Sequence, residues 1–177
     1  MARLARVPLI GLPLVIAAAL AASPARLPAQ TQAPAGPQEA GVVGLFLDSA
    51  SLQPTVVLQG KRDRRRFGMV IGAAEATGIV FPLENRVPPR PLTHDLFLTL
   101  FGRLKVTVTR VVITDLKDGI YYAIVILDAG GKEMQLDARP SDAIALAIRA
   151  KAPVLVEDRV FERGSTPAAP GPRKPAI

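Results

Sequence analysis

The chain has 177 residues, with 22 lysine and arginine side chains against 15 aspartate and glutamate side chains, and it has no cysteine. This length suggests one domain with room for a hydrophobic core, and the lack of cysteine excludes disulfides and thiolate metal sites. The net charge of +7 lies mostly in the terminal segments, because residues 40–162 carry 16 basic and 14 acidic side chains. A domain charge of about +2 gives little support to nucleic-acid binding on charge alone.

Residues 1–29 have the pattern of a secretory signal peptide. Arg3 and Arg6 precede an apolar stretch of about 16 residues with two prolines, and small residues follow it. The stretch is short for a membrane helix, which needs about 20 residues, although a retained anchor is the alternative. We expect cleavage after Ala29 or near Ala22, a secreted or periplasmic protein, and no stable membrane association after the cut.

Two segments rich in proline and alanine flank the domain. Residues 30–40 are expected to form a linker and residues 164–177 a disordered tail, because neither has enough apolar side chains to form a core. The domain is therefore expected to span residues 41–163.

The first half of the domain is predicted to contain three strands and a helix. A basic loop joins the last two strands as a hairpin, and Phe67, Met69 and Ile71 alternate along the third strand. Gly78 lowers the propensity of the helix that follows. The strands are expected at 42–48, 55–59 and 67–71, the loop at 60–66 and the helix at 72–83.

A short helix is predicted in the middle of the domain. Residues 87–91 contain three prolines, which exclude regular structure there. Thr93 is a good N-cap for a helix over 96–101, and Asp95 lies in its first turn. Leucine and phenylalanine pairs spaced four residues apart give this helix an apolar stripe.

The second half is predicted to contain more antiparallel strands and a last helix. Asp118-Gly119 indicates a type I′ hairpin turn, since both central residues of that turn need positive φ. Strands that follow one another without regular βαβ alternation, together with three helices, indicate an α+β fold with a mostly antiparallel sheet. The strands are expected at 105–115, 120–128, 133–137 and 153–157, and the helix at 140–150.

The helix at 140–150 is the most apolar helix outside the N-terminal segment. Pro140 suits its first position, and Asp142 suits the positive end of its dipole. No polar residue occurs between Ala143 and Ile148, and a helix that is apolar on all sides is buried on all sides. Any function of this helix is therefore expected at its charged start.

A weak internal repeat relates two parts of the domain. Residues 67–81 and 134–148 are 67 positions apart and share the order of a strand, a corner, an acidic residue and an apolar helix. Glu75 matches Asp142 in this alignment. We interpret the repeat as a duplicated hairpin-plus-helix unit, which places the two carboxylates at related helix starts.

Three segments resemble one known family. P-P-R-P-L-T-H-D-L (88–96), V-V-I-T-D-L-K-D-G-I-Y-Y-A (111–123) and D-A-R-P-S-D-A-I-A-L-A (137–147) resemble the bifunctional nuclease domain, which is also known as a domain of unknown function. The resemblance covers residues 42–162. It implies a compact, duplicated α+β domain that is often oligomeric and has members that cut DNA and RNA.

The chain departs from the family pattern in two places. Most members carry the domain in the cytoplasm, whereas this chain begins with a predicted signal peptide. The family usually has prolines around the corner before the first acidic residue, where this chain has Gly68-Met69 and Ala73-Ala74. The second departure leaves the corner at Glu75 less rigid than in the family.

Phosphodiester hydrolysis needs charge neutralisation at the phosphate, an activated water and a proton for the leaving group. Carboxylates that hold Mg²⁺ or Mn²⁺ can supply the first two. His94 is the only histidine, which excludes a mechanism with two histidines of one chain. The nuclease hypothesis assigns His94, Asp95 and Arg139 to catalysis, Glu75 and Asp142 to a Mg²⁺ or Mn²⁺ ion with Asp137 as a further candidate, and Arg90, Lys61, Arg62, Arg64 and Arg65 to nucleic-acid binding.

Each of these residues also has a structural interpretation. His94 can pack against the proline-rich arm, Asp142 can simply stabilise a helix start, and Arg139 can pair with Asp142 or Glu75. The basic loop can be a solvated hairpin tip rather than a phosphate contact. Ser141 is better explained by local backbone bonding than by nucleophilic attack.

Two functions therefore stay open. The first is an exported nuclease that acts on DNA, RNA or both with little sequence preference. The alternative is a non-catalytic module that binds a partner or a small ligand through the same polar residues at the start of the helix at 140–150. Their spatial expectations differ, because a nuclease needs His94, Asp95, Arg139 and Asp142 to meet at one site open to solvent.

Overall fold

The computed structural model describes residues 36–48 and 51–164. The predicted signal peptide and the predicted tail beyond Gly164 lie outside the described residues. None of the helices described in those two ranges is long and apolar enough to cross a membrane.

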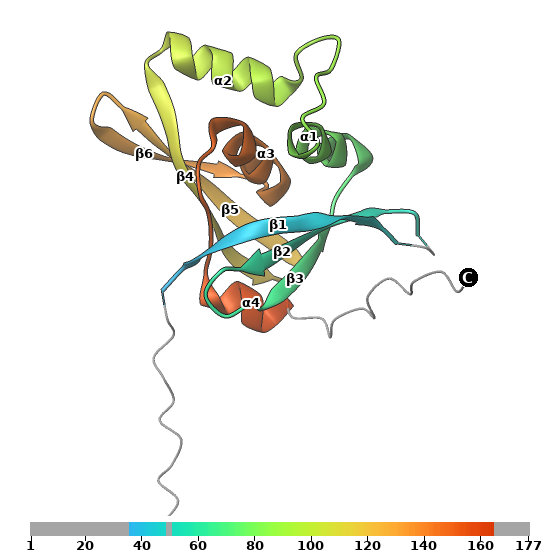
Figure 1. The fold of residues 1–177 in the computed structure, drawn as a ribbon. Coiled ribbons are helices and arrows are strands. Elements are labelled where there is room, and N and C mark those ends of the chain that lie inside the picture. The colour runs from blue at the N-terminus through green and yellow to red at the C-terminus, as the bar shows by residue number, and fades with distance from the viewer. Residues whose placement is uncertain (1–35, 49–50, 165–177) are drawn as a thin grey trace, which may run out of the picture. The chain divides into compact units, whose positions relative to one another are not determined.

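The described residues form seven strands and four helices (Figure 1). The strands form one sheet in the order β3-β2-β1-β7-β4-β5-β6, in which only the β4–β7 pair is parallel. The elements in chain order are β1 (Gln38–Leu47), β2 (Pro54–Gly60), β3 (Arg66–Val70), α1 (Ala73–Leu83), α2 (Thr93–Arg103), β4 (Val106–Lys117), β5 (Ile120–Ala129), β6 (Lys132–Ala138), α3 (Pro140–Ala150), β7 (Val154–Val156) and α4 (Asp158–Gly164).

This architecture confirms the predicted α+β fold with a mostly antiparallel sheet, with one helix more than expected. Helix α4 has only seven residues, so its sequence is too short to show a helical period. It nevertheless buries Val160 and Phe161 completely. The Phe161 ring meets that of Phe67 edge to face, with 5.2 Å between the ring centroids, so α4 covers the end of β3.

Two copies of one unit make up most of the domain. Each copy is an antiparallel three-stranded meander followed by an 11-residue helix: β1-β2-β3-α1 and then β4-β5-β6-α3. The two helices start and end 67 positions apart. Residues with positive φ also recur at this spacing, at Leu52 and Gly119 and at Arg64 and Gly131. Asp118 and Gly119 both have positive φ, as the predicted hairpin turn requires.

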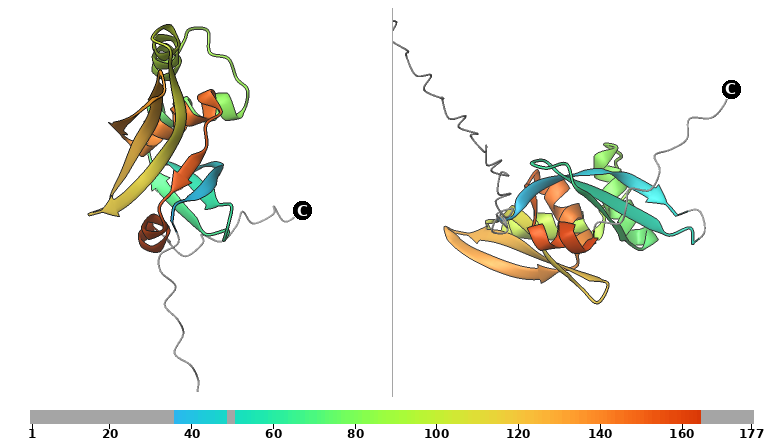
Figure 2. Two further views of the ribbon diagram at one scale, coloured as in Figure 1. Left: turned by 90° about the vertical axis from the view of Figure 1, so that its left-hand side faces the viewer. Right: turned by 90° about the horizontal axis from the view of Figure 1, so that it is seen from below.

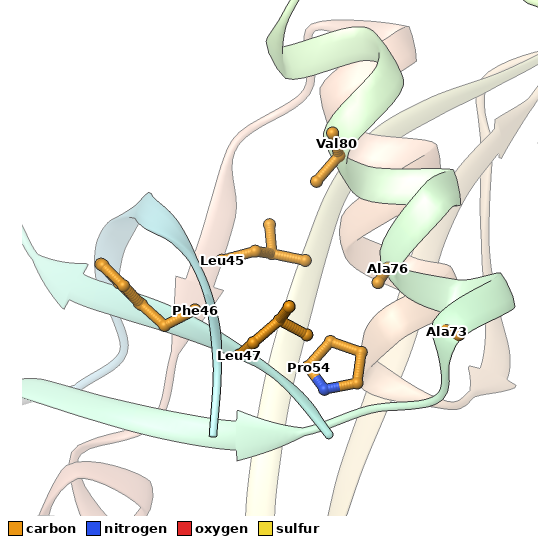
Figure 3. Close-up of a pocket in the computed structure, with 7 residues that line it drawn as sticks. All are labelled: Leu45, Phe46, Leu47, Pro54, Ala73, Ala76 and Val80. Carbon is orange, nitrogen blue, oxygen red and sulfur yellow. The ribbon is translucent and has the colours of Figure 1, made fainter. Parts of the chain in front are cut away.

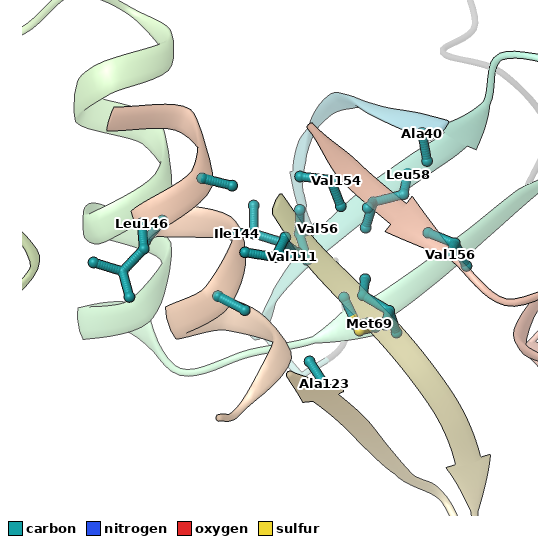
Figure 4. Close-up of a cluster of buried hydrophobic side chains, with 14 of the residues drawn as sticks. Ala40, Val56, Leu58, Met69, Val111, Ala123, Ile144, Leu146, Val154 and Val156 are labelled. Atoms are coloured by element: carbon teal, nitrogen blue, oxygen red, sulfur yellow. The ribbon is translucent and has the colours of Figure 1, made fainter. Parts of the chain in front are cut away.

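Helix α3 lies at the centre of the core, and Figure 4 shows its residue Ile144 among side chains from both meanders, including Val56 of β2 and Val111 of β4. All three of these side chains are fully buried. The small alanines of α3 let α1 pack closely beside it. The predicted burial of this helix on all sides is confirmed, since seven of its residues are buried: Pro140, Ser141, Ala143, Ile144, Ala145, Leu146 and Ala147.

Strand β1 begins at Gln38, four residues before the predicted strand and inside the segment that was expected to be linker. Gln38–Ala40 pair with β7, and the Gln38 side chain is buried and donates a hydrogen bond to Asp63. The sequence Gln-Glu-Ala is too polar to indicate a strand, and only the distant partner strand explains its conformation.

Candidate functional site

The starts of α1, α2 and α3 bring four polar side chains together, which we call the corner: Glu75, His94, Arg139 and Asp142. Glu75 and Asp142 are the third residues of α1 and α3, where the positive end of the helix dipole favours a carboxylate. Arg139 is the N-cap residue of α3, and His94 is the second residue of α2. The corner therefore unites both repeat units with a helix that belongs to neither.

Arg139 bridges the two carboxylates of the corner. Its Nε donates to Asp142 Oδ2 at 2.7 Å, and its Nη1 donates to Glu75 Oε1 at 2.8 Å. The arginine side chain is 66% exposed, so solvent screens these pairs and each contributes less than about 1 kcal/mol. Arg139 thus makes both of the ion pairs that the structural interpretation predicted for it. Its guanidinium is nevertheless exposed and accessible to a ligand.

The arginine also sets the charge of the corner. The pKa of Glu75 is lowered by its own backbone N–H and by Arg139. Burial alone would raise the pKa of Asp142, but hydrogen bonds from Arg139 and His94 outweigh burial and lower it. The hydrogen bonds that Arg139 donates to Asp142 and Glu75 raise its own pKa. Both carboxylates are thus ionised at neutral pH and balanced by one guanidinium.

His94 is held by packing on one side and by Asp142 on the other. Its Nε2 lies 3.3 Å from Asp142 Oδ1. Its Nδ1 is buried without a hydrogen-bond partner among the described residues, and the side chain is 14% exposed. Gly78 of α1 lies against the ring, since a Cβ at this position would be 2.8 Å from the imidazole Cε1. Gly78 appeared in the sequence only as a residue that weakens a helix, and the structure shows that it makes room for the imidazole.

Asp95 follows His94 in the chain but turns to other partners. Its Oδ2 accepts a hydrogen bond from the backbone N–H of Leu92 at 2.8 Å, and its Oδ1 accepts one from Nε of Arg149 at 2.7 Å. Burial raises the pKa of Asp95, and these hydrogen bonds outweigh it and lower the pKa. Leu92 rather than the predicted Thr93 is the N-cap residue of α2, because Asp95 supplies the capping oxygen.

The basic loop lies elsewhere. It packs beside α4, at the end of the domain opposite α2 (Figures 1 and 2). Arg65 pairs with Asp63 and with Asp158, the first residue of α4. Burial raises the pKa of Asp63, but hydrogen bonds from Arg65 and Gln38 outweigh burial and lower it to about 2. The other cations predicted to bind nucleic acid vary in their contacts: Lys61 pairs with Glu39, Arg62 lies 3.8 Å from Asp158, and Arg64 is exposed at the turn.

Arg90 and Asp137 are the remaining candidates from the sequence. Arg90 is exposed on the segment that leads into α2, four residues before His94. Asp137 is exposed on the edge strand β6, two residues before Arg139. Ser141 is buried in the first turn of α3. The structure thus brings Glu75, His94, Arg139 and Asp142 into direct contact, while Asp95 faces Arg149 and the basic loop lies apart.

An apolar pocket of about 320 Å³ lies on another face of α1. Figure 3 shows Leu45 and Leu47 of β1 on one side of the pocket and Ala76 and Val80 of α1 on the other. All seven of its lining residues are apolar, so the pocket offers no group for acid–base chemistry.

The corner offers a limited set of metal ligands. Within residues 36–48 and 51–164, no three or more His, Asp or Glu side chains are grouped to hold a metal ion. Glu75 and Asp142 supply two hard oxygen ligands, but the Arg139 guanidinium lies between them. Mg²⁺ usually keeps several waters and uses one or two carboxylates plus substrate phosphates. The residues therefore fit a hydrated Mg²⁺ or Mn²⁺ ion, provided that Arg139 moves off the carboxylates.

Comparison with known proteins identifies relatives. The family model of the bifunctional nuclease domain matches residues 56–169. An uncharacterized protein of Mycobacterium tuberculosis, present in strains H37Rv and CDC 1551, is 37% identical over 123 residues, which cover 70% of this chain and 73% of that protein. The bifunctional nuclease 1 of rice is 33% identical over 94 residues, which cover 51% of this chain but 28% of the rice protein.

Gly78→Ala tests the contact between α1 and His94. In most helices this change stabilises by about 0.5–1 kcal/mol, but here the new methyl group must displace the imidazole. We expect no gain in the free energy of unfolding, measured by urea denaturation. Gly102→Ala in α2 is the matched control, because a Cβ there meets nothing within 4 Å, and it should show the ordinary gain. Equal gains in both variants would contradict the contact.

Arg139→Gln tests the charge balance of the corner. The folded-state pKa values of Glu75 and Asp142 lie below the ordinary values of 4.5 and 3.8, so their stabilising contribution is present at neutral pH and is lost as the pH falls through those values. The variant should be less stable than the wild type at pH 7, and the difference should vanish in acid, as measured by urea denaturation across pH. Arg86→Gln, which breaks an exposed pair with Glu84, is the control. A difference that stays constant with pH would contradict the bridge.

Proposed function

The chain belongs to the bifunctional nuclease domain family, and on this premise we propose that it is an exported nuclease that hydrolyses phosphodiester bonds of DNA, RNA or both with little sequence preference. The family implies a nucleic-acid substrate. The observation that carries the proposal is the corner, where the imidazole of His94 lies 3.3 Å from Asp142 beside the exposed guanidinium of Arg139. An acid–base group thereby lies next to a phosphate-binding group, and the guanidinium is open to solvent.

His94 is the proton carrier of this mechanism. Because Nδ1 is enclosed, protons can pass between the ring and a water or a leaving oxygen only through Nε2. Asp142 accepts a hydrogen bond from Nε2 when the ring is protonated and so orients it. In a Ser-His-Asp triad the carboxylate contacts the other ring nitrogen, whereas here it contacts the nitrogen that must react. Nε2 must move from Asp142 towards the substrate when it takes up or gives up the proton.

Arg139 is the phosphate-binding group. A guanidinium can bind two phosphate oxygens at once, and this one is held only by pairs that solvent screens. Arg90 lies exposed on the segment before α2 and supplies a second phosphate contact. The loop cations contribute a weaker contact that depends on salt, because Glu39, Asp63 and Asp158 neutralise part of their charge.

A Mg²⁺ or Mn²⁺ ion belongs to the proposal as a cofactor. Oxygens of Glu75 and Asp142 would hold it, and when bound it would neutralise phosphate charge and activate a water. Arg139 pairs with both carboxylates, so it would have to leave them before they could hold the ion, and a substrate phosphate is the group to which it would move. Metal and substrate are therefore expected to bind together.

A second candidate function has its own observation. Glu75 and Asp142 already share Arg139, and Asp95 is paired with Arg149. A corner whose carboxylates are all paired also suits a module that binds an anionic partner or small ligand without catalysis. The two candidate functions differ in one measurable result: a nuclease cleaves added nucleic acid, and a binding module leaves it intact.

The proposed assembly is a homo-oligomer. We call the exposed side chains Leu96, Phe97, Leu100, Leu104, Met134 and Leu136 the apolar face. Met134 and Leu136 lie opposite Leu127 and Val125 of β5, which are buried in the core, so they point to the side of the sheet that carries α3. Their counterparts in the first unit, Phe67 and Met69, are 2% exposed. Both residues of the first set lie in the core cluster, and Phe161 of α4 packs on Phe67. Because Met134 and Leu136 stay 47% and 43% exposed in the described structure, a second copy of the chain is the proposed cover.

Export rests on residues 1–29, whose pattern is that of a signal peptide. We propose that the protein acts in the periplasm or outside the cell, free of the membrane after cleavage. Expression of all 177 residues should yield extracytoplasmic protein that begins at Gln30 or near Ser23, as determined by mass spectrometry. Uncleaved protein in the membrane fraction would contradict the proposal.

The nuclease proposal predicts that purified protein degrades DNA or RNA with Mg²⁺ or Mn²⁺ and that EDTA abolishes the activity. His94→Ala and Asp142→Asn should each lower kcat by about 100-fold or more, since acid–base groups contribute about that factor. Asp128→Asn is the matched control, because Asp128 only bonds a hairpin N–H. Intact nucleic acid at high concentrations of folded protein would instead support the binding module.

The oligomer proposal predicts a change of mass when charge enters the apolar face. Phe97→Glu combined with Leu100→Glu should convert the assembly to monomers, because a buried carboxylate without a partner is costly. Val87→Glu, at a side chain that is 91% exposed, should leave the mass unchanged. Analytical ultracentrifugation measures both, and a wild-type protein that is monomeric at high concentration would rule out this interface.

A further inference from the structure

Arg149 is a buried cation that joins three helices. It lies in the last turn of α3, and its side chain is 8% exposed. Its Nε donates to Asp95 of α2 at 2.7 Å, and its Nη1 donates to the carbonyl oxygen of Gly78 in α1 at 2.5 Å and to that of Ala145 at 3.0 Å. A charged group this deep in a protein needs such partners to offset its lost hydration.

The two distant partners of Arg149 are the two residues that place His94. Asp95 follows His94 in the chain, and Gly78 is the residue against which the imidazole packs. Arg149 therefore holds both sides of the histidine, although neither its guanidinium nor its hydrogen bonds involve the ring itself.

Helix α2 needs this anchor. None of its residues is fully buried, and its N-cap Leu92 has no side chain that can accept a hydrogen bond. The segment before α2 contains three prolines and gives the helix no regular neighbour. Only Leu98 and Phe101 of α2 pack against the core cluster, and both lie past the first turn. Besides the contacts of His94 itself, the first turn is held by Asp95, which accepts from Arg149 with one oxygen and from Leu92 with the other.

We propose that Arg149 is the positioning residue of this site: through Asp95 and Gly78 it locks the start of α2 onto α1 and so sets the distance between His94 and Asp142. The expected effect on kcat rests on the proposed function, whereas the expected position of His94 next to Asp142 does not depend on activity. It also assigns Asp95 a positioning role instead of the acid–base role that the sequence suggested. The guanidinium geometry matters, because Lys offers one point of charge where Arg offers several fixed donors.

The test uses the full chain without a histidine tag, so that His94 is the only histidine and its ring signals in a ¹H–¹³C NMR spectrum are unambiguous. In the wild-type background, Asp142→Asn should shift the His94 ring signals because the two groups touch. In an Arg149→Met background, the same Asp142→Asn change should produce a much smaller shift, because the ring no longer lies at Asp142.

Kinetics provide the second readout. Arg149→Met should lower kcat by about 100-fold, the order expected when a reacting group is displaced by about 1 Å, while KM changes little because Arg139 is untouched. Arg149→Lys should restore part of kcat. Arg163→Met is the matched control, because it removes an arginine of α4 that pairs with Asp115 of β4 at 2.6 Å, away from the corner. It should leave both the His94 signals and kcat unchanged.

The outcomes separate this inference from the nuclease proposal. Unchanged His94 signals and an unchanged response to Asp142→Asn in folded Arg149→Met would overturn the positioning role, whether or not the protein cuts nucleic acid. Absent nuclease activity with the expected NMR result would overturn the proposed function and leave the positioning role supported. If Arg149→Met does not fold, Asp95→Asn replaces it, since this variant weakens the same bond but keeps an oxygen that can accept from the buried Arg149. It must then shift the His94 signals for the inference to hold.

Discussion

The burial of α3 on all sides is the constraint on which the rest of the domain depends. Its apolar middle fills the space between the two meanders and α1, and a close-packed helix of this kind cannot shift or rotate without opening cavities. Both polar ends of α3 are therefore fixed in space. The start carries Arg139 and Asp142, and the last turn carries Arg149. Helix α3 therefore places both Asp142, which contacts His94, and Arg149, which pairs with Asp95 of α2.

Duplication explains the carboxylate pair but not the whole corner. Glu75 and Asp142 occupy the same position in two copies of one unit, whereas the counterpart of Arg139 in the first copy is Gly72. One guanidinium consequently serves two acids. The histidine comes from α2, and the residue 67 positions after it is Phe161 of α4. The corner thus combines two equivalent carboxylates with two residues, Arg139 and His94, that have no equivalent in the other copy.

The elements predicted from the sequence were those that local patterns determine. The α3 helix, the hairpin at Asp118-Gly119 and the repeat could be recognised because dihedral preferences, periodicity and spacing lie within short segments. Helix α4, the early start of β1 and the N-cap of α2 could not, because each depends on a partner far away in the chain. The site shows the same division. The polar residues of the corner were identified by chemical type. Gly78 was interpreted only as a residue that weakens a helix, and no local pattern singles out Arg149, because tertiary contacts alone show what these two residues hold.

Strand β7 has a consequence for the order of folding. It has only three residues, yet it lies between the two meanders, pairing with Gln38–Ala40 on one side and with Val111–Ile113 on the other. Until it inserts, β1 and β4 each present an unpaired edge, the kind of edge that leads to aggregation. The pairing of Gln38 with Val156 joins positions 118 residues apart, and contacts this distant form slowly because a long loop must close first. The strand that joins the two meanders into one sheet is therefore supplied by nearly the last segment of the domain to be synthesised.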